Sequence, residues 1–145
     1  MELLVKEANE GYVASKYERL YEKKLLSVLS EKGVELVKVV KSYVGGDEGD
    51  EEFVFQFSVF VRNDSEGIRD FLNESLGLLY KDIEDDCSVY TLSLTGYFGD
   101  ADVLKEDCEL FLEILGEEND MELLEDTCNH FSKQLPNEVL EVLVL

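Results

Sequence analysis

The sequence is short of the residues on which several large classes of protein depend. It holds one Pro, one His, three Cys and no Trp in 145 residues. Cys87, Cys108 and Cys128 form an odd set without a C-x-x-C pair, which excludes a disulfide framework and favours a reducing, cytoplasmic location. No run approaches the roughly eighteen apolar residues of a membrane span, and no apolar segment follows a basic start. We therefore expect neither a transmembrane helix nor a signal peptide.

Motifs for catalysis and for cofactor binding are also lacking. There is no G-x-S-x-G, no P-loop and no dinucleotide fingerprint. His130, the only histidine, lies two residues from Cys128, so the two side chains should point to different faces of a helix. We interpret His130 as an ordinary helix-surface residue, and such scattered Cys and His do not make a zinc site. We expect no enzyme, no cofactor and no metal site; a small enzyme that uses paired carboxylates is the weakest interpretation.

Positive charge is scarce and unevenly placed. The chain has 13 Lys and Arg against 34 Asp and Glu, a net charge of −21. Residues 1–41 hold eight Lys or Arg and seven Asp or Glu, so all of the excess acid follows them. This charge exceeds the roughly 2–8 that keeps a small domain soluble. It repels nucleic acid and anionic membranes and attracts cationic partners, so we expect a basic protein as the partner.

The hydrophobic pattern predicts a single α+β domain over residues 1–145, with residues 1–12 loosely ordered. A 45% apolar content is enough for a core. Apolar residues follow the helical period in four segments and a strand-like pattern in four others: helices at 13–32, 64–80, 100–116 and 120–135, and strands at 34–44, 52–62, 87–98 and 138–145. The resulting order, α-β-β-α-β-α-α-β, predicts a mostly antiparallel sheet of about four strands with helices packed on one face.

Local signals support these boundaries. They comprise a capping box, further N-caps, a C-cap glycine and a terminating proline: Ser15 with Glu18, Asp64 or Ser65, Asp100, Gly33 and Pro136. The loop at 47–52 and the charged turn at 82–86 crowd carboxylates that could collect Ca²⁺ or Mg²⁺. Neither segment has the EF-hand spacing, so we interpret both as solvated acidic turns.

Acidic residues form a pattern on the third predicted helix. Five of them recur at spacings of four, three, four and four, which places them on one stripe: Asp102, Glu106, Glu109, Glu113 and Glu117. Glu122 extends the stripe into the fourth helix, and Asp85 and Asp86 add charge in the turn at 82–86. Neighbours on such a stripe lie about 5–6 Å apart at Cβ, which is close to the spacing of phosphates along a nucleic-acid strand. Because like charges at these spacings destabilise a helix, the stripe favours a binding surface, with an ordinary solvated face as the alternative.

Two functional hypotheses follow. In the first, the protein binds and inhibits a nucleic-acid-binding protein by presenting carboxylates in place of phosphates. Phage anti-defence proteins and immunity proteins against nuclease toxins are similar to this chain in charge, size and lack of motifs, and in nothing more specific. In the second, the protein is a non-catalytic interaction or assembly module, acidic only for solubility. A homodimer formed through the apolar C-terminal strand or through the first helix belongs to this second hypothesis.

Overall fold

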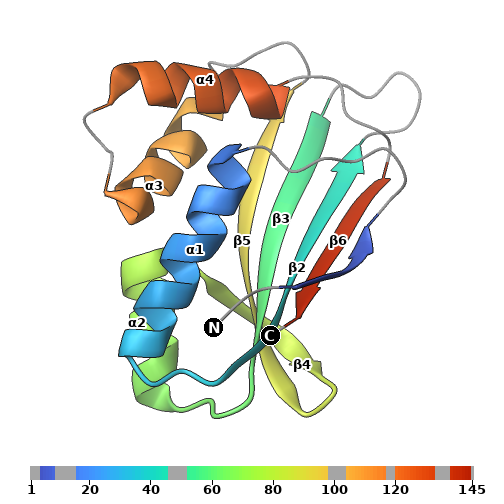
Figure 1. The fold of residues 1–145 in the computed structure, drawn as a ribbon, viewed down its shortest axis with the longest axis vertical. Helices are drawn as coiled ribbons and strands as arrows, with labels where there is room; N and C mark the ends of the chain where they lie inside the picture. The colour runs from blue at the N-terminus through green and yellow to red at the C-terminus, as the bar shows by residue number, and fades with distance from the viewer. Residues whose placement is uncertain are drawn as a thin grey trace.

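The computed structural model describes residues 4–8, 16–45, 52–97, 104–116, 120–132 and 138–144. Within these residues six strands form one sheet, and four helices cover one of its faces (Figure 1). The predicted α+β class, with helices on one side of an antiparallel sheet, is confirmed.

Every strand pair in the sheet is antiparallel, and the strand order is β1-β6-β2-β3-β5-β4. The strands have these bounds: β1 Leu4–Ala8, β2 Leu36–Gly45, β3 Glu52–Val61, β4 Leu79–Glu84, β5 Cys87–Tyr97 and β6 Glu138–Val144. β2 and β3, which are consecutive strands in the chain, pair with Val39 opposite Val59 and Tyr43 opposite Phe55.

Two strands lie beyond the four that were predicted. β1 lies in the segment expected to be loosely ordered, and it pairs with β6. β4 occupies what was predicted to be a helix end and a charged turn. All six of its side chains are exposed, so it has no alternating pattern and is held by backbone pairing with β5. The charged turn shrinks to Asp85 and Asp86, whose φ values of 50° and 62° lie in the left-handed region that Asp tolerates.

The four helices match the predicted segments and are shorter at their ends: α1 Lys16–Glu31, α2 Glu66–Leu76, α3 Lys105–Leu115 and α4 Met121–Ser132. Ser65 caps α2 as predicted, because its Oγ accepts a hydrogen bond from Ile68 N at 3.2 Å. Gly33 ends α1 with a φ of 70°, and the Val34 amide bonds to the Leu29 carbonyl at 3.0 Å. The expected roles of Ser15, Asp100, Pro136 and the loop at 47–51 lie outside the described residues.

The core lies between the helices and one face of the sheet. On β3, Phe53, Phe55, Phe57, Val59 and Val61 are all fully buried, as their alternation predicted. The stripes of all four helices pack on this layer: Tyr21, Leu25 and Leu29 of α1, Leu72 and Leu76 of α2, Cys108 and Leu112 of α3, and Leu124, Cys128 and Phe131 of α4. Backbone alternation on the strands and helical periodicity therefore converge on one apolar layer.

β6 is an interior strand of the sheet. It pairs with β1 on one side and with β2 on the other. Because both of its backbone edges are bonded within the chain, this apolar strand completes its own sheet and leaves no free edge to which another chain could add.

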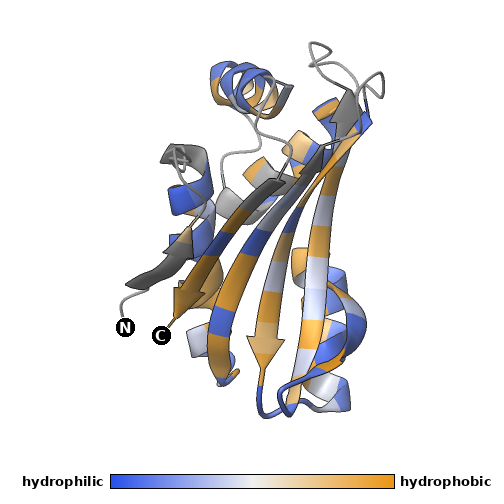
Figure 2. Ribbon diagram, turned by 90° about the vertical axis from the view of Figure 1, so that its right-hand side faces the viewer, coloured by the Kyte–Doolittle hydropathy of each residue, from blue (hydrophilic) through white to orange (hydrophobic). Residues whose placement is uncertain are grey.

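The face of the sheet opposite the helices has no covering layer among the described residues, and Figure 2 looks onto the sheet from that side. A small second cluster of Phe60, Cys87 and Val89 lies on this face, with Val37 and Val40 packed against it. One face of the sheet therefore packs against the helices in the core, and we call the other the open face.

Candidate partner-binding surface

The acidic stripe of α3 faces away from the core. Glu106, Glu109 and Glu113 are exposed, whereas Cys108 and Leu112 on the opposite side of the helix are buried. The helical period thus separates the carboxylates from the core residues, as the sequence predicted. Asp102 and Glu117, the two ends of the predicted stripe, lie outside the described residues.

α4 extends this negative surface beside α3. Glu122, Glu125 and Asp126 are exposed, while Leu124 is buried in the core cluster. The two helices together carry seven Asp and Glu residues and a single Lys or Arg, Lys105. We call the exposed carboxylates of Glu106, Glu109, Glu113, Glu122, Glu125 and Asp126 the α3–α4 acidic face.

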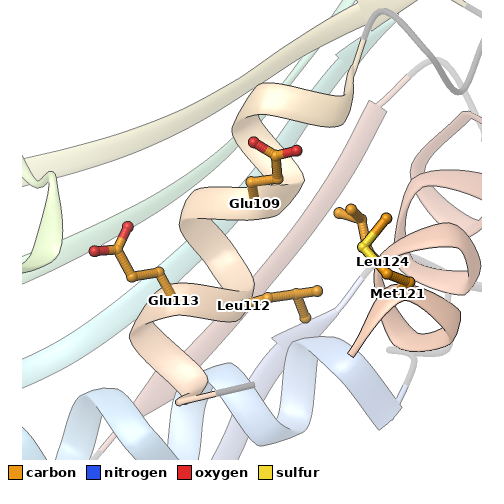
Figure 3. Close-up of a pocket in the computed structure, with 5 residues that line it drawn as sticks. All are labelled: Glu109, Leu112, Glu113, Met121 and Leu124. Atoms are coloured by element: carbon orange, nitrogen blue, oxygen red, sulfur yellow. The ribbon is translucent and has the colours of Figure 1, made fainter. Parts of the chain in front are cut away.

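A shallow pocket of about 320 Å³ opens between α3 and α4. In Figure 3 Leu112 points from α3 toward Leu124 and Met121 of α4, while the carboxylates of Glu109 and Glu113 project outward from α3. Met121 is 62% exposed. The pocket therefore combines an apolar floor with a negative rim, an arrangement that suits the aliphatic stem and charged end of a Lys or Arg.

The predicted surface residues do not form one patch. Asp85 and Asp86 are exposed, but they occupy the tip of the β4–β5 hairpin at the other end of the molecule's long axis from α4 (Figure 1). They cannot extend the α3–α4 acidic face, and the hairpin tip is a separate acidic site.

The structure also contains a buried cluster of charges that the sequence analysis missed. Lys41 of β2 is fully buried, and its Nζ lies 3.1 Å from Glu18 Oε2, 2.7 Å from Glu22 Oε1 and 2.5 Å from Glu141 Oε1. Glu18 and Glu22 come from α1 and Glu141 from β6, and all three are buried. Lys41 donates a hydrogen bond to Glu18 and forms ion pairs with Glu22 and Glu141. We call Lys41 and these three carboxylates, with Arg19 and His130, the buried charge cluster.

Arg19 and His130 close the rim of the buried charge cluster. Arg19, which is 39% exposed, lies 3.0 Å from both Glu22 Oε2 and Glu141 Oε1. Burial alone would lower the pKa of Arg19, but the two carboxylates outweigh it and raise the pKa. His130 Nε2 lies 3.0 Å from Glu18 Oε1, so this nitrogen carries the hydrogen that it donates to the carboxylate. The interpretation of His130 as an ordinary surface residue is therefore wrong: it is 18% exposed and bonded to a buried glutamate.

A sequence signal for this cluster existed. Lys41 shares the strand parity of Val39 and Tyr43, and Glu141 stands between apolar residues of the last strand. A single charge of each sign on core-facing positions of two strands is the pattern of a buried pair. The pairing itself, Lys41 opposite Glu141 on neighbouring strands, depends on a strand order that the sequence does not specify.

The cysteines do not form a nucleophilic site. Cys108 of α3 and Cys128 of α4 are buried, and their thiols are hydrogen-bonded to each other. This bond and burial raise the pKa of the Cys108 thiol, which keeps it in the unreactive protonated form. Cys87 lies in the cluster on the open face of the sheet, on the other side of the strands from His130. A Cys–His pair is thus not assembled from any of these residues.

A second polar cluster joins the start of α2 to β5. Asp64 accepts a hydrogen bond of 2.7 Å from Tyr90 Oη and one of 3.1 Å from Arg69, whose guanidinium lies 4.3 Å from the Tyr80 ring centroid. Burial tends to raise the pKa of Asp64, but hydrogen bonds from Tyr90, Ser88 and Arg69 outweigh it and lower the pKa. This cluster fixes α2 on the sheet rather than forming a site.

Replacing Asp64 with Asn should destabilise the protein by about 1–2 kcal/mol at neutral pH, because charge-assisted hydrogen bonds are lost. The carboxylate has a lower pKa in the folded chain, so its stabilisation is present above the unfolded value of about 3.9 and is lost as the pH falls through the folded value. Urea unfolding from pH 7 to pH 3 should therefore show the gap between wild type and D64N closing in acid. Asp70→Asn, at an exposed position of α2, is the control; an equal pH dependence in the two variants would contradict the assignment.

No metal site or membrane span is found in the described parts of the chain. No group of three or more His, Cys, Asp or Glu among them is placed to hold a metal ion. The described residues include the acidic turn at 82–86 but not the loop at 47–51. No helix in the same residues is long and apolar enough to cross a membrane.

Comparisons with known proteins find no match. No family model matches the sequence, and neither the curated proteins nor the solved structures contain a similar chain at the threshold applied.

Proposed function

We propose that this protein binds a basic surface of another protein through the α3–α4 acidic face and thereby blocks the binding of nucleic acid there. The observation that supports the proposal is the one-sided charge of these two helices, which expose six carboxylates beside a single lysine. A field of this kind speeds the approach of a cationic partner and is weakened by salt. Protein inhibitors of nucleases and phage inhibitors of host defence enzymes are the classes in which this mode of action would serve.

The pocket between α3 and α4 could hold one side chain of the partner and so fix the position of the proposed contact. A Lys or Arg of the partner can lay its aliphatic stem on Met121 and Leu124 while its charged end meets Glu109 and Glu113. Residues that read phosphates on a nucleic-acid-binding surface are largely Arg and Lys, so such side chains are available on the proposed partner.

The buried charge cluster does not compete with this proposal as a catalytic site. Its carboxylates are already engaged by Lys41, Arg19 and His130, and Glu18 and Lys41 have no exposed surface. The proposed activity is therefore binding, without a chemical step.

Reversing the charge of the stripe tests this proposal. The probe is a panel of basic DNA-binding proteins, each bound to a fluorescein-labelled DNA duplex. The protein should displace the duplex at about 100 mM salt, where the Debye length is about 10 Å. Glu106→Lys, Glu109→Lys and Glu113→Lys combined should weaken the displacement by at least about 100-fold, because like charges then meet across the contact. Raising the salt should weaken the wild type in the same direction.

A second triple variant separates the surface from the net charge. Glu66→Lys, Asp70→Lys and Glu74→Lys change the charge by the same amount on the exposed side of α2. This control should displace DNA within a few-fold of wild type. Equal losses in the two variants would mean that only the overall charge matters, and retained displacement in the α3 variant would remove the α3–α4 acidic face from consideration.

A further inference from the structure

Among the side chains that the structure describes, those across the centre of the open face are almost all uncharged, in a protein of net charge −21. The strand registers place neutral side chains across its centre: Val40 and Ser42 of β2, Val54, Gln56, Ser58 and Phe60 of β3, Leu79 of β4, Val89, Thr91, Ser93 and Thr95 of β5, and Leu140, Val142 and Val144 of β6. Among the described residues Lys38 is the charged side chain nearest the middle, and it lies 4.4 Å from the Phe60 ring centroid. The described carboxylates on this face lie at its margins, with Glu52 at one end and Asp82 and Glu84 on the edge strand β4.

Four of the polar side chains on this face are hydrogen-bonded in pairs. Ser58 Oγ and Thr91 Oγ1 share a hydrogen bond of 3.0 Å, and Gln56 Nε2 donates to Ser93 Oγ at 3.3 Å. Polar groups that are already paired lose little when water is removed from them. The face can therefore be covered by an apolar or neutral surface without leaving these groups unpaired.

The same face exposes apolar side chains. Leu140 is 40% exposed and Leu79 is 64% exposed, and they lie on opposite sides of the central strands. Both would gain from burial at about 25 cal/mol per Å² of apolar surface removed from water.

We propose that this face binds the same face of a second copy of the chain, forming a homodimer with two sheets stacked face to face. A symmetric dimer brings each surface against itself, so a surface without central carboxylates is the one that two such acidic chains can share without like charges meeting. A basic partner, by contrast, finds no described carboxylate at the centre of this face. The arrangement differs from the predicted homodimers, which used the C-terminal strand or the first helix.

The size of the face fits such a dimer. Strands β6, β2, β3 and β5 span roughly 19 Å at about 4.8 Å per strand, and their length of about nine residues gives roughly 30 Å. The flat area is therefore roughly 600 Å² per copy, or about 1,200 Å² for the pair, which reaches the lower bound for a stable interface before β4 is counted. Sheets stacked in this way lie about 10 Å apart.

The dimer is a further property beside the binding of a basic protein, and its stability should depend on salt in the opposite way. Two chains of charge −21 repel each other at long range, so added salt should strengthen the dimer by screening that repulsion. Salt should weaken binding to a cationic partner. In the dimer the helices lie on the outer sides, which leaves both α3–α4 acidic faces free.

Sedimentation equilibrium at low and high salt tests the dimer on the full chain. The wild type should be dimeric at micromolar concentrations in high salt and should dissociate in low salt. Ser93→Glu places a carboxylate on the face and should weaken the dimer by at least about tenfold, because burying an unpaired charge in the interface is costly. Ser75→Glu adds the same charge at an exposed position of α2 and should change the dimer by less than about threefold.

Circular dichroism and thermal unfolding of both variants ensure that any change is in association and not in folding. A wild type that stays monomeric at high salt would overturn the proposal. So would a dimer that S93E and S75E weaken equally, since its interface would then lie elsewhere. Either outcome leaves the proposed binding of a basic protein untouched, because that binding is measured by displacement of DNA.

Discussion

Replacing Lys41 with Met should lower the free energy of unfolding by about 3–5 kcal/mol, the usual cost of removing one partner from a buried ion pair. Lys41 Nζ contacts three buried carboxylates, and in K41M the exposed rim residue Arg19 would be the main cation left beside Glu22 and Glu141. The loss is a large share of the 5–15 kcal/mol that stabilises an ordinary domain. Urea unfolding followed by circular dichroism measures it.

Lys38→Met is the matched control on the same strand. Lys38 lies on the opposite face of β2, is partly exposed, and makes a cation–π contact with Phe60. Its removal should cost less than about 1 kcal/mol. If K41M and K38M prove equally mild, the ammonium of Lys41 does not offset the buried carboxylates.

A second substitution tests whether the cost comes from unpaired charge. Adding Glu141→Gln to K41M removes the charge of one of the carboxylates that lost Lys41 as a partner. The double variant should therefore be more stable than K41M alone. Glu141→Gln by itself should destabilise, since it breaks the pairs with Lys41 and Arg19. A double-mutant cycle that shows strict additivity would contradict this account.

Periodicity predicted the parts of the fold in which side-chain type and burial agree. The alternating Phe and Val of β3 and the apolar stripes of the helices are in the core as expected. β4 was missed because its six side chains are all exposed and mix polar with apolar types. Its place in the sheet depends on backbone bonds to β5. Backbone pairing at an edge leaves no hydrophobic pattern in the sequence.

Prediction of the candidate site had a similar limit. Exposure of Glu106, Glu109 and Glu113 follows from helical period, which acts within one element. The buried charge cluster and the open face depend on which strands become neighbours, as in Lys41 with Glu141 and Ser58 with Thr91. Such contacts join residues far apart in the chain, and local periodicity contains no information on them.

Replacing Phe131 with Ala should destabilise the protein by about 3–5 kcal/mol, the usual cost of removing a buried aromatic ring. Phe131 is fully buried near the end of α4, and its ring centroid lies 5.1 Å from that of Phe55 on β3. It also contacts the ring of His130, so it links the core to the buried charge cluster. Met121→Ala on the same helix is the control, because Met121 is 62% exposed and should cost less than about 1 kcal/mol.

The same variant connects the core to the proposed binding surface. α4 supplies half of the α3–α4 acidic face, and its attachment to the sheet includes the contact of Phe131 with Phe55. Hydrogen exchange should therefore become faster in α4 of F131A than in β2 and β3, which keep their pairing in the centre of the sheet. If β3 and α4 lose protection equally, the helix does not open on its own. The acidic surface would then be as rigid as the core beneath it, and displacement of DNA should fall only in proportion to the unfolded fraction.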